Sequence, residues 1–227
     1  MTLSLTPLEK LTLRDHAYLE LRRALLSGRF SPGERILLRD IASELEISLT
    51  PVRDAVNHLI AERVLDRGPG GQKGGASVPH LDASEFQQLT AMRVDLESRL
   101  TLAAASRISH EEILLLESLV QQMKDSIDGE NKNYYLDLHR RFHFTLYDAA
   151  QMPLIRDTTE TLWLRCGPAL NAVLTDYVPN LKRNDYHHAA VEALHSGDQK
   201  KVMRCIRNDI REAGIYIYQQ LLALQEK

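Results

Sequence analysis

The segment His139-Arg140-Arg141-Phe142-His143 holds two imidazole side chains four positions apart. On a helix, residues at this spacing lie on one face, so both rings could reach a single metal ion. A zinc hydrolase of the H-E-x-x-H kind would need a glutamate directly after the first histidine as its general base. Arg140 stands there instead and is a poor base at any working pH. The pair therefore argues against a zinc hydrolase. Taken alone, such a pair arises on a helix by chance more often than as a metal site.

A second group of polar side chains could read DNA. Ser48, Thr50, Arg53 and Asn57 fall in the first turns of an expected helix. Arg53 and Asn57 share a face, where arginine can bind guanine through two donors and asparagine can pair with adenine. Arg39, at the start of the preceding helix, is placed to contact a phosphate. The alternative is that Arg53 is a solvated surface arginine paired with an acidic side chain.

Two short helices, expected over residues 38–45 and 50–62, would position these side chains. The connector Glu46-Ile47-Ser48 between them is tight, Ser48 or Thr50 can cap the second helix, and Pro51 fits its first turn. This spacing predicts a helix-turn-helix, whose second helix fits the major groove of DNA. A further helix is expected over residues 16–27, ending at Gly28.

A β-hairpin is expected after the second short helix. The apolar strand 64–67 is followed by residues 68–75, which hold five of the chain's 11 glycines, and residues 76–78 form the returning strand. With Lys73 at its tip, this hairpin would be a wing that contacts DNA beside the helix-turn-helix. A plain flexible linker is the alternative for so many glycines.

From residue 84 onward nearly the whole sequence is typical of helix. Helices are expected over 84–107, 110–129, 134–150, 153–176, 185–195 and 198–226. We therefore predict a mainly α protein with three parts. A winged helix-turn-helix with a small β-hairpin occupies residues 1–79, a linker occupies 80–84, and an all-helical bundle of six or seven helices occupies 85–227.

The composition limits the class of protein. Hydrophobic residues make up 44% and charged residues 26%, which is typical of a globular protein with a packed core. Residues 1–80 have 11 Lys and Arg against 10 Asp and Glu, so charge alone would not indicate nucleic-acid binding. Neither a bilayer-spanning apolar run nor a secretory signal is visible. Cys166 and Cys205 form no disulfide framework, so we expect a cytoplasmic protein with reduced thiols and no membrane partner.

Five segments resemble a known family. They are LRRALLSGRFSPG at 21–33, SLTPVRDAV at 48–56, MRVDLE at 92–97, FHFTL at 142–146 and ALHSGD at 193–198. The chain is similar to the GntR family, in its FadR-like branch with an FCD effector domain, over nearly all of residues 15–215. The resemblance implies a ligand-responsive transcription regulator, a metabolite-sensing repressor that binds a double-stranded DNA operator. One departure is Leu49, where the family usually has arginine, and it puts in doubt any operator inferred from relatives.

A homodimer is expected, because one recognition helix covers too few base pairs and two-fold pairing matches palindromic half-sites. In the FCD branch, the resemblance further implies a metal site made of an Asp or Asn, a His four residues later and two more histidines. The matching positions are His139, His143, His187 and Asp209, so the carboxylate stands last instead of first. The neighbouring His188 is a rival ligand. Three nitrogens and one oxygen suit zinc, nickel or manganese, and the residues alone do not choose between these divalent ions.

Arg93, in the segment that resembles the family's R-x-x-L-E, is the expected effector-binding residue. Its planar guanidinium suits a carboxylate, so we expect a small anionic metabolite. The alternative is an Arg93–Glu97 pair that only braces helices. Trp163, Arg165 and Tyr134 are equally plausible as pocket lining, core or surface. The competing functions are a structural helix bundle, and a helical metal-binding protein or metalloenzyme, each with a DNA-binding-like module at its N-terminus.

Overall fold

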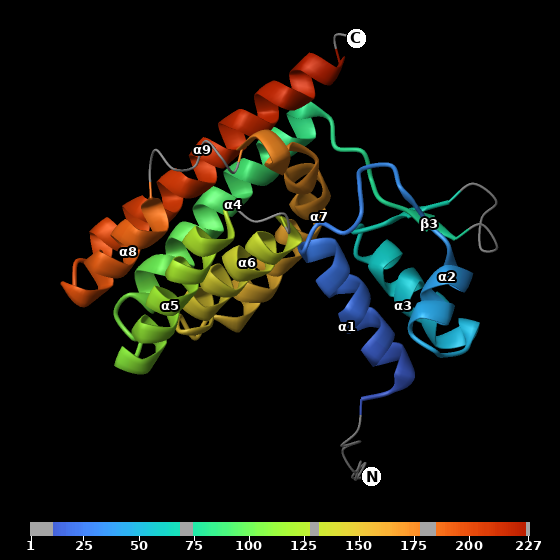
Figure 1. Ribbon diagram of the computed structural model, residues 1–227, viewed down its shortest axis with the longest axis horizontal. Coiled ribbons are helices and arrows are strands. Elements are labelled where there is room, and N and C mark those ends of the chain that lie inside the picture. The colour runs from blue at the N-terminus through green and yellow to red at the C-terminus, as the bar shows by residue number, and fades with distance from the viewer. Residues whose placement is uncertain (1–10, 69–74, 128–131, 178–184, 226–227) are drawn as a thin grey trace, which may run out of the picture. The chain divides into compact units, whose positions relative to one another are not determined.

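The computed structural model describes residues 11–68, 75–127, 132–177 and 185–225 (Figure 1). The described residues are mainly helical with one small antiparallel sheet, which confirms the predicted fold class. The chain divides into two compact units. The first runs up to Ala24 and continues over Gly33–Pro79, and the second contains Leu25–Pro32 and the chain from His80 onward.

Three helices of the N-terminal region form the helix-turn-helix and its support: α1 (Leu13–Leu26), α2 (Leu38–Glu44) and α3 (Leu49–Ala61). The chain turns sharply after α2, because Glu46 adopts a left-handed conformation with φ 54°. The Ile47 amide then donates to the Ala42 carbonyl at 3.0 Å. Pro51 lies in the first turn of α3, as predicted, where a missing N–H has no cost.

The first unit contains a three-stranded sheet of very short strands. These are β1 (Arg35–Ile36), β2 (Asp66–Arg67) and β3 (Ala76–Ser77), in the order β1-β3-β2. β2 and β3 pair antiparallel, with Asp66 opposite Ser77, so the residues that flank the glycine-rich segment form the expected hairpin instead of a plain linker. β1 was not predicted. Residues 69–74, including Lys73, lie outside the described residues.

A polar contact joins α1 to the end of α3. The Tyr18 hydroxyl lies 2.8 and 2.9 Å from the two carboxylate oxygens of Glu62. Arg22 Nη1 donates to the Tyr18 oxygen at 2.6 Å, and the ring of Tyr18 stacks on His58 with centroids 4.6 Å apart. α1 thereby supports the helix that carries the predicted DNA-reading residues.

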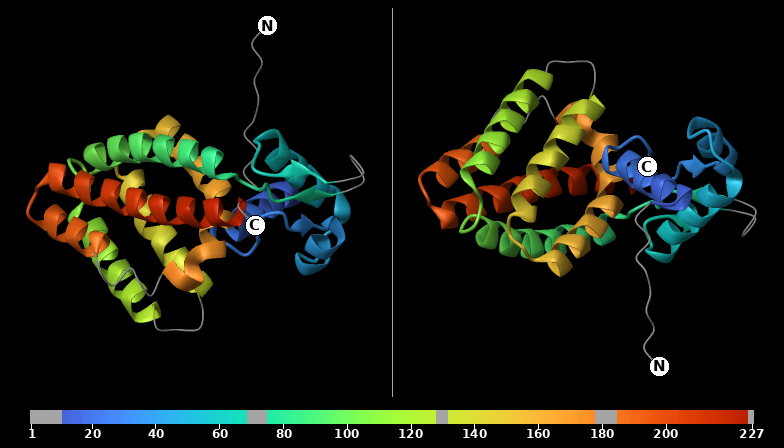
Figure 2. Two further views of the ribbon diagram at one scale, coloured as in Figure 1. Left: turned by 90° about the horizontal axis from the view of Figure 1, so that it is seen from above. Right: turned by 90° about the horizontal axis from the view of Figure 1, so that it is seen from below.

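The second unit is a bundle in which six helices are described. They are α4 (Ala83–Ala104), α5 (His110–Ser126), α6 (Lys132–Asp148), α7 (Pro153–Tyr177), α8 (Tyr186–His195) and α9 (Gln199–Gln225). The long helices α4 and α9 run side by side, α8 folds back along α9, and α5 packs on α6 (Figure 2). Among the described residues, no helix combines the length and the apolarity needed to cross a membrane.

Side-chain caps fix where these helices begin. Asp82 accepts from the Glu85 amide while Glu85 accepts from the Asp82 amide, a capping box that starts α4 inside the predicted linker. Ser109 and Glu112 form the same arrangement at α5. Asp185 accepts from the His188 amide at 2.9 Å and starts α8. The α8 cap matters for function because it sets the rotation of the helix that carries two adjacent histidines.

The core between α4, α7 and α9 is apolar. Phe86 and Leu89 of α4 pack there with Leu162 and Cys166 of α7 and with Ile217 of α9. Both cysteines of the chain are buried free thiols. At Gly214 of α9, an added Cβ would lie 2.5 Å from Cγ2 of Thr90 on α4. α4 and α9 therefore approach so closely at Gly214 that any side chain there would require Thr90 to move.

Candidate functional site

The exposed face of α3 carries the predicted DNA-reading residues. Val52, Ala55, Val56 and Leu59 form the buried face of α3. Thr50, Arg53 and Asn57 are exposed on the helix, as are Arg39 on α2 and Ser48 at the α3 N-cap. The Ser48 side chain makes no capping hydrogen bond, so this cap is weaker than expected and its hydroxyl is not held by the helix. Among the described residues Arg53 has no ion-pair partner, which speaks against the surface-pair alternative.

Three helices of the second unit bring together a compact cluster of potential metal ligands. α6 supplies His139 and His143, α8 supplies His187 and α9 supplies Asp209, and their ligand atoms all lie within 4.8 Å of one another. His143 Nε2 lies 3.2 Å from His139 Nε2 and 3.1 Å from His187 Nε2. Asp209 Oδ2 lies 3.4 Å from His143 Nε2. The four residues named from the sequence are therefore neighbours in the fold.

The cluster fits a metal ion. Bonds of about 2.0–2.1 Å in a tetrahedral arrangement place neighbouring ligand nitrogens about 3.3 Å apart, close to the separations around His143. Without a cation these contacts cannot all be satisfied, because Nε2 of a neutral His143 offers a single in-plane lone pair or a single proton. A cation at the centre would accept a lone pair from every member.

Burial sets the protonation states of the cluster. It lowers the pKa of His143 to about 3, and the charge of His139 acts in the same direction. Burial also lowers the pKa of His187. For Asp209 burial favours a higher pKa, but its interactions with His187, His139 and His143 outweigh burial and hold the pKa well below its usual value. At neutral pH His143 and His187 are thus neutral imidazoles and Asp209 is a carboxylate, which are the forms that bind a metal ion.

The rival ligand His188 is excluded by the rotation of α8. His187 is 8% exposed and points into the cluster. The side chain of His188 is 52% exposed and pairs with Glu192, 3.5 Å away in the next turn.

The side chains of Trp163 and Arg93 lie beside the cluster. The ring of Trp163 on α7 lies 5.5 Å from that of His139 and 5.2 Å from that of His143. The Arg93 guanidinium lies over the same indole at 4.7 Å. Trp163 Nε1 is buried and has no hydrogen-bond partner in the described part of the chain. An unused donor and a cation therefore stand next to the candidate ligands.

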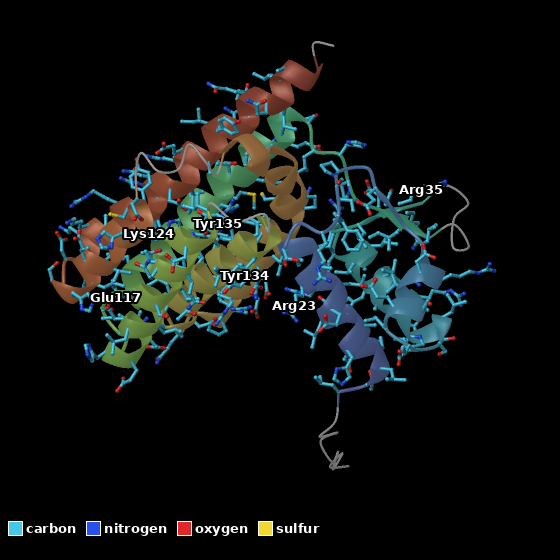
Figure 3. The ribbon with its side chains drawn as sticks, viewed as in Figure 1. Arg23, Arg35, Glu117, Lys124, Tyr134 and Tyr135 are labelled. Carbon is cyan, nitrogen blue, oxygen red and sulfur yellow. The ribbon has the colours of Figure 1, made fainter. Side chains whose placement is uncertain are left out.

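The other candidate pocket residues differ in how exposed their side chains are. Tyr134 is 47% exposed and its hydroxyl bonds Gln122, so it does not line the cluster. Its neighbour Tyr135, which is labelled in Figure 3, is buried. The ring of Tyr135 stacks on that of His139 with centroids 6.1 Å apart. Arg165 is half-buried, and its Nε has no partner among the described residues. Of the positions left open for Tyr134, the structure shows the surface one, and the tyrosine beside the cluster is Tyr135.

Two further residues behind His143 were missed. His143 Nδ1 lies 2.8 Å from the Tyr147 hydroxyl, which donates to Glu97 Oε2 at 2.5 Å. Glu97 also pairs with Arg93 through Nε and Oε1 at 2.8 Å, so the helix-internal pair weighed as an alternative is present. A signal existed in the sequence. Tyr135, His139, His143 and Tyr147 recur every four residues and hence share one face of α6.

A separate surface groove of about 490 Å³ lies between α5 and α8. Its lining includes Leu114, Lys124, His188 and Val191, and none of the four cluster residues. Lys124 Nζ lies 2.8 Å from Asp185 Oδ2, so its charge is already neutralised.

Known proteins resemble this chain in both halves. Residues 13–72 match the model "Bacterial regulatory proteins, gntR family", and residues 88–212 match "FCD domain". The HTH-type transcriptional regulator McbR of Escherichia coli K12 is 23% identical over 203 residues, covering 88% of this chain and 90% of McbR. The gluconate operon transcriptional repressor of Bacillus subtilis is 23% identical, covering 90% and 86%.

The solved structures agree on the fold. That of Escherichia coli McbR/YncC has a TM-score of 0.86 at 22% identity, covering 93% of this chain and 99% of that one. A GntR regulator from Rhodococcus sp. RHA1 has a TM-score of 0.69 at 19% identity, covering 90% and 96%. At these identities the likeness establishes the arrangement of helices and no shared ligand.

Proposed function

This chain belongs to the GntR family of bacterial regulatory proteins and has an FCD domain, and from that premise we propose that it is a metabolite-sensing repressor with a metal ion in its effector pocket. It is a transcription regulator rather than an enzyme, as the named relatives are. We assign DNA binding to residues 1–79, effector binding to residues 85–227 and the linker to 80–84. Such a regulator would work in the cytoplasm.

DNA binding is assigned to the exposed face of α3. Arg53 and Asn57 would contact base edges, because bidentate side chains on a recognition helix discriminate between base pairs. Ser48, Thr50 and Arg39 would add contacts at the groove edge and to phosphates, and Lys73 would add one from the wing. Leu49 removes one cation from this surface, so the operator is expected to differ from those of relatives.

The observation that carries the metal assignment is the convergence of His139, His143, His187 and Asp209 on one point. Three nitrogens and one oxygen suit zinc, nickel or manganese. When bound, such an ion would supply a Lewis-acidic contact for an anionic group. The chain's own residues would add hydrogen bonds. The Trp163 indole N–H could donate to a carboxylate, and Arg93 beside it, which pairs with Glu97 through Nε, could donate to one through another N–H of its guanidinium. A small anionic metabolite is therefore the expected effector.

Elemental analysis of protein purified without an affinity tag tests this proposal. The wild type should hold one divalent transition metal per chain, and His143→Ala should hold none. Asp209→His should retain metal, because imidazole replaces carboxylate as the ligand. His188→Ala is the matched control, since it removes an adjacent, exposed histidine and should leave the metal content unchanged.

Thermal stability provides an independent measurement. An ion that binds only the folded state, at about 100 times its dissociation constant, stabilises it by about 2.7 kcal/mol. Added zinc, nickel or manganese should therefore raise the melting temperature of the wild type and not that of His143→Ala. A wild type that carries no metal and gains no stability from any of the three would show that the pocket is an ordinary organic-ligand site lined by histidines.

A further inference from the structure

We propose that Tyr147 and Glu97 are positioning residues that fix the tautomer of His143 and so direct the lone pair of its Nε2 into the ligand cluster. The proposal deepens the metal-dependent function proposed above, and the affinity measurement that tests it rests on that function. The two residues reach His143 from behind, on the side of the imidazole away from the other ligands.

The hydrogen-bond chain starts from a permanent cation. Arg93 cannot lose its proton in a protein, and its Nε donates to Glu97 Oε1 at 2.8 Å. The Glu97 side chain is completely buried, so this ion pair is shielded from water. One oxygen of the Glu97 carboxylate, Oε1, bonds the cation. The second oxygen, Oε2, has no proton to donate and can only accept a hydrogen bond.

Tyr147 transmits this constraint to the imidazole. Its hydroxyl has one proton, which it donates to Glu97 Oε2 at 2.5 Å. At its second contact, 2.8 Å from His143 Nδ1, the phenol oxygen can therefore only accept. Nδ1 must then bear the hydrogen, and in the neutral ring Nε2 keeps its lone pair.

The direction of that lone pair connects metal binding to the hydrogen-bond chain from Arg93 through Glu97 and Tyr147, here called the relay. Nε2 is the atom of His143 that faces His139, His187 and Asp209. Partners behind a metal-binding histidine fix its tautomer and ring orientation, and losing one costs about 10–100-fold in metal affinity. Among the described residues His139 has no such support, because its buried Nδ1 lacks a hydrogen-bond partner. The fold thus holds His143 in a binding-competent state by a contact that His139 lacks.

Imidazole ¹⁵N chemical shifts of the metal-free full-length protein test the tautomer directly. In the wild type His143 should be protonated at Nδ1. Tyr147→Phe removes the only hydroxyl of the relay with little change in shape, and His143 should shift toward the Nε2–H form. Should Tyr147→Phe fold poorly, Glu97→Gln removes the charge that makes Tyr147 a donor and should shift the tautomer in the same direction.

Metal affinity, measured by competition with a chromophoric chelator for zinc, nickel or manganese, gives the second readout. Tyr147→Phe should bind about 10–100-fold more weakly than the wild type. Tyr18→Phe is the matched control, because it removes a hydroxyl from the tyrosine–glutamate contact of the other unit and should leave affinity unchanged. Wild-type affinity together with an unchanged tautomer in Tyr147→Phe would overturn the inference. A wild type without metal affinity would instead refute the proposed function, while the chemical shifts would still decide the tautomer.

Discussion

Both ring nitrogens of His143 have close partners in a fully buried environment. Nδ1 contacts the Tyr147 hydroxyl and Nε2 faces the remaining ligands. A histidine constrained on both sides has one orientation and loses little conformational entropy when a ligand binds. This residue is therefore where substitutions should affect metal binding most.

Arg53 is the residue whose replacement tests the DNA-binding assignment. Arg53→Ala should weaken binding to the DNA upstream of the chain's own gene by about 1–3 kcal/mol and relax specificity at one base pair, because a bidentate base contact is lost. Gel-shift titrations at fixed salt against a set of single-base variants measure both effects. Arg99→Ala, which removes an equally exposed arginine from α4, is the control and should bind as the wild type does. Unchanged operator affinity in Arg53→Ala would show that α3 is not the recognition helix.

Side-chain chemistry was predictable from the sequence wherever the partners lie in one helix. His139 and His143 are four residues apart, so their proximity follows from helical geometry alone. Glu97 and Tyr147 come together from different helices, 50 residues apart, and no local pattern encodes that contact. His187 and His188 could be distinguished only after the Asp185 cap had fixed where α8 begins.

At the scale of elements, the packing of α4 on α9 depends on Gly214. Gly214→Ala places a methyl group against Thr90 Cγ2, so it should destabilise the protein by about 1–3 kcal/mol despite the higher helix propensity of alanine. Thr90→Ser removes that methyl while keeping the hydroxyl that bonds the Phe86 carbonyl at 2.9 Å.

The double variant Gly214→Ala with Thr90→Ser should therefore recover most of the lost stability. Urea unfolding of the wild type, both single variants and the double variant forms a complete cycle. Simple additivity of the two single effects would show that the contact is not the cause.

Long elements were predictable and short ones were not. Apart from α6, each helix of the second unit begins at a capping residue or a proline that is visible in the sequence. The predicted limits of all six match to within a few residues. β1 consists of only Arg35 and Ile36, too short for an alternating pattern, and it exists because β3 offers it hydrogen bonds. β1 depends on pairing with a strand that is distant in the sequence, so the local sequence cannot predict it.

For the whole molecule, the short recognition helix leads us to expect a second copy of the chain. A single recognition helix covers too few base pairs for specific binding, so we expect a homodimer that places two copies on palindromic half-sites. Sedimentation at micromolar concentration should give twice the mass of the 25.8 kDa chain. A protein that sediments only as a monomer, with or without operator DNA, would contradict this expectation.

The spread of the four ligands along the chain gives the proposed ion a second consequence. His139 and Asp209 enclose the whole of α7 and α8 between them, and both cysteines are free thiols. An ion held by α6, α8 and α9 would act as a cross-link in the bundle, closing a long loop as a disulfide does. Unlike a disulfide, this metal cross-link could form and break reversibly, because it depends on the concentration of the ion and not on an oxidant. Local opening of α8 would then require release of a ligand, so the rigidity of this end of the bundle would vary with the metal content of the cell.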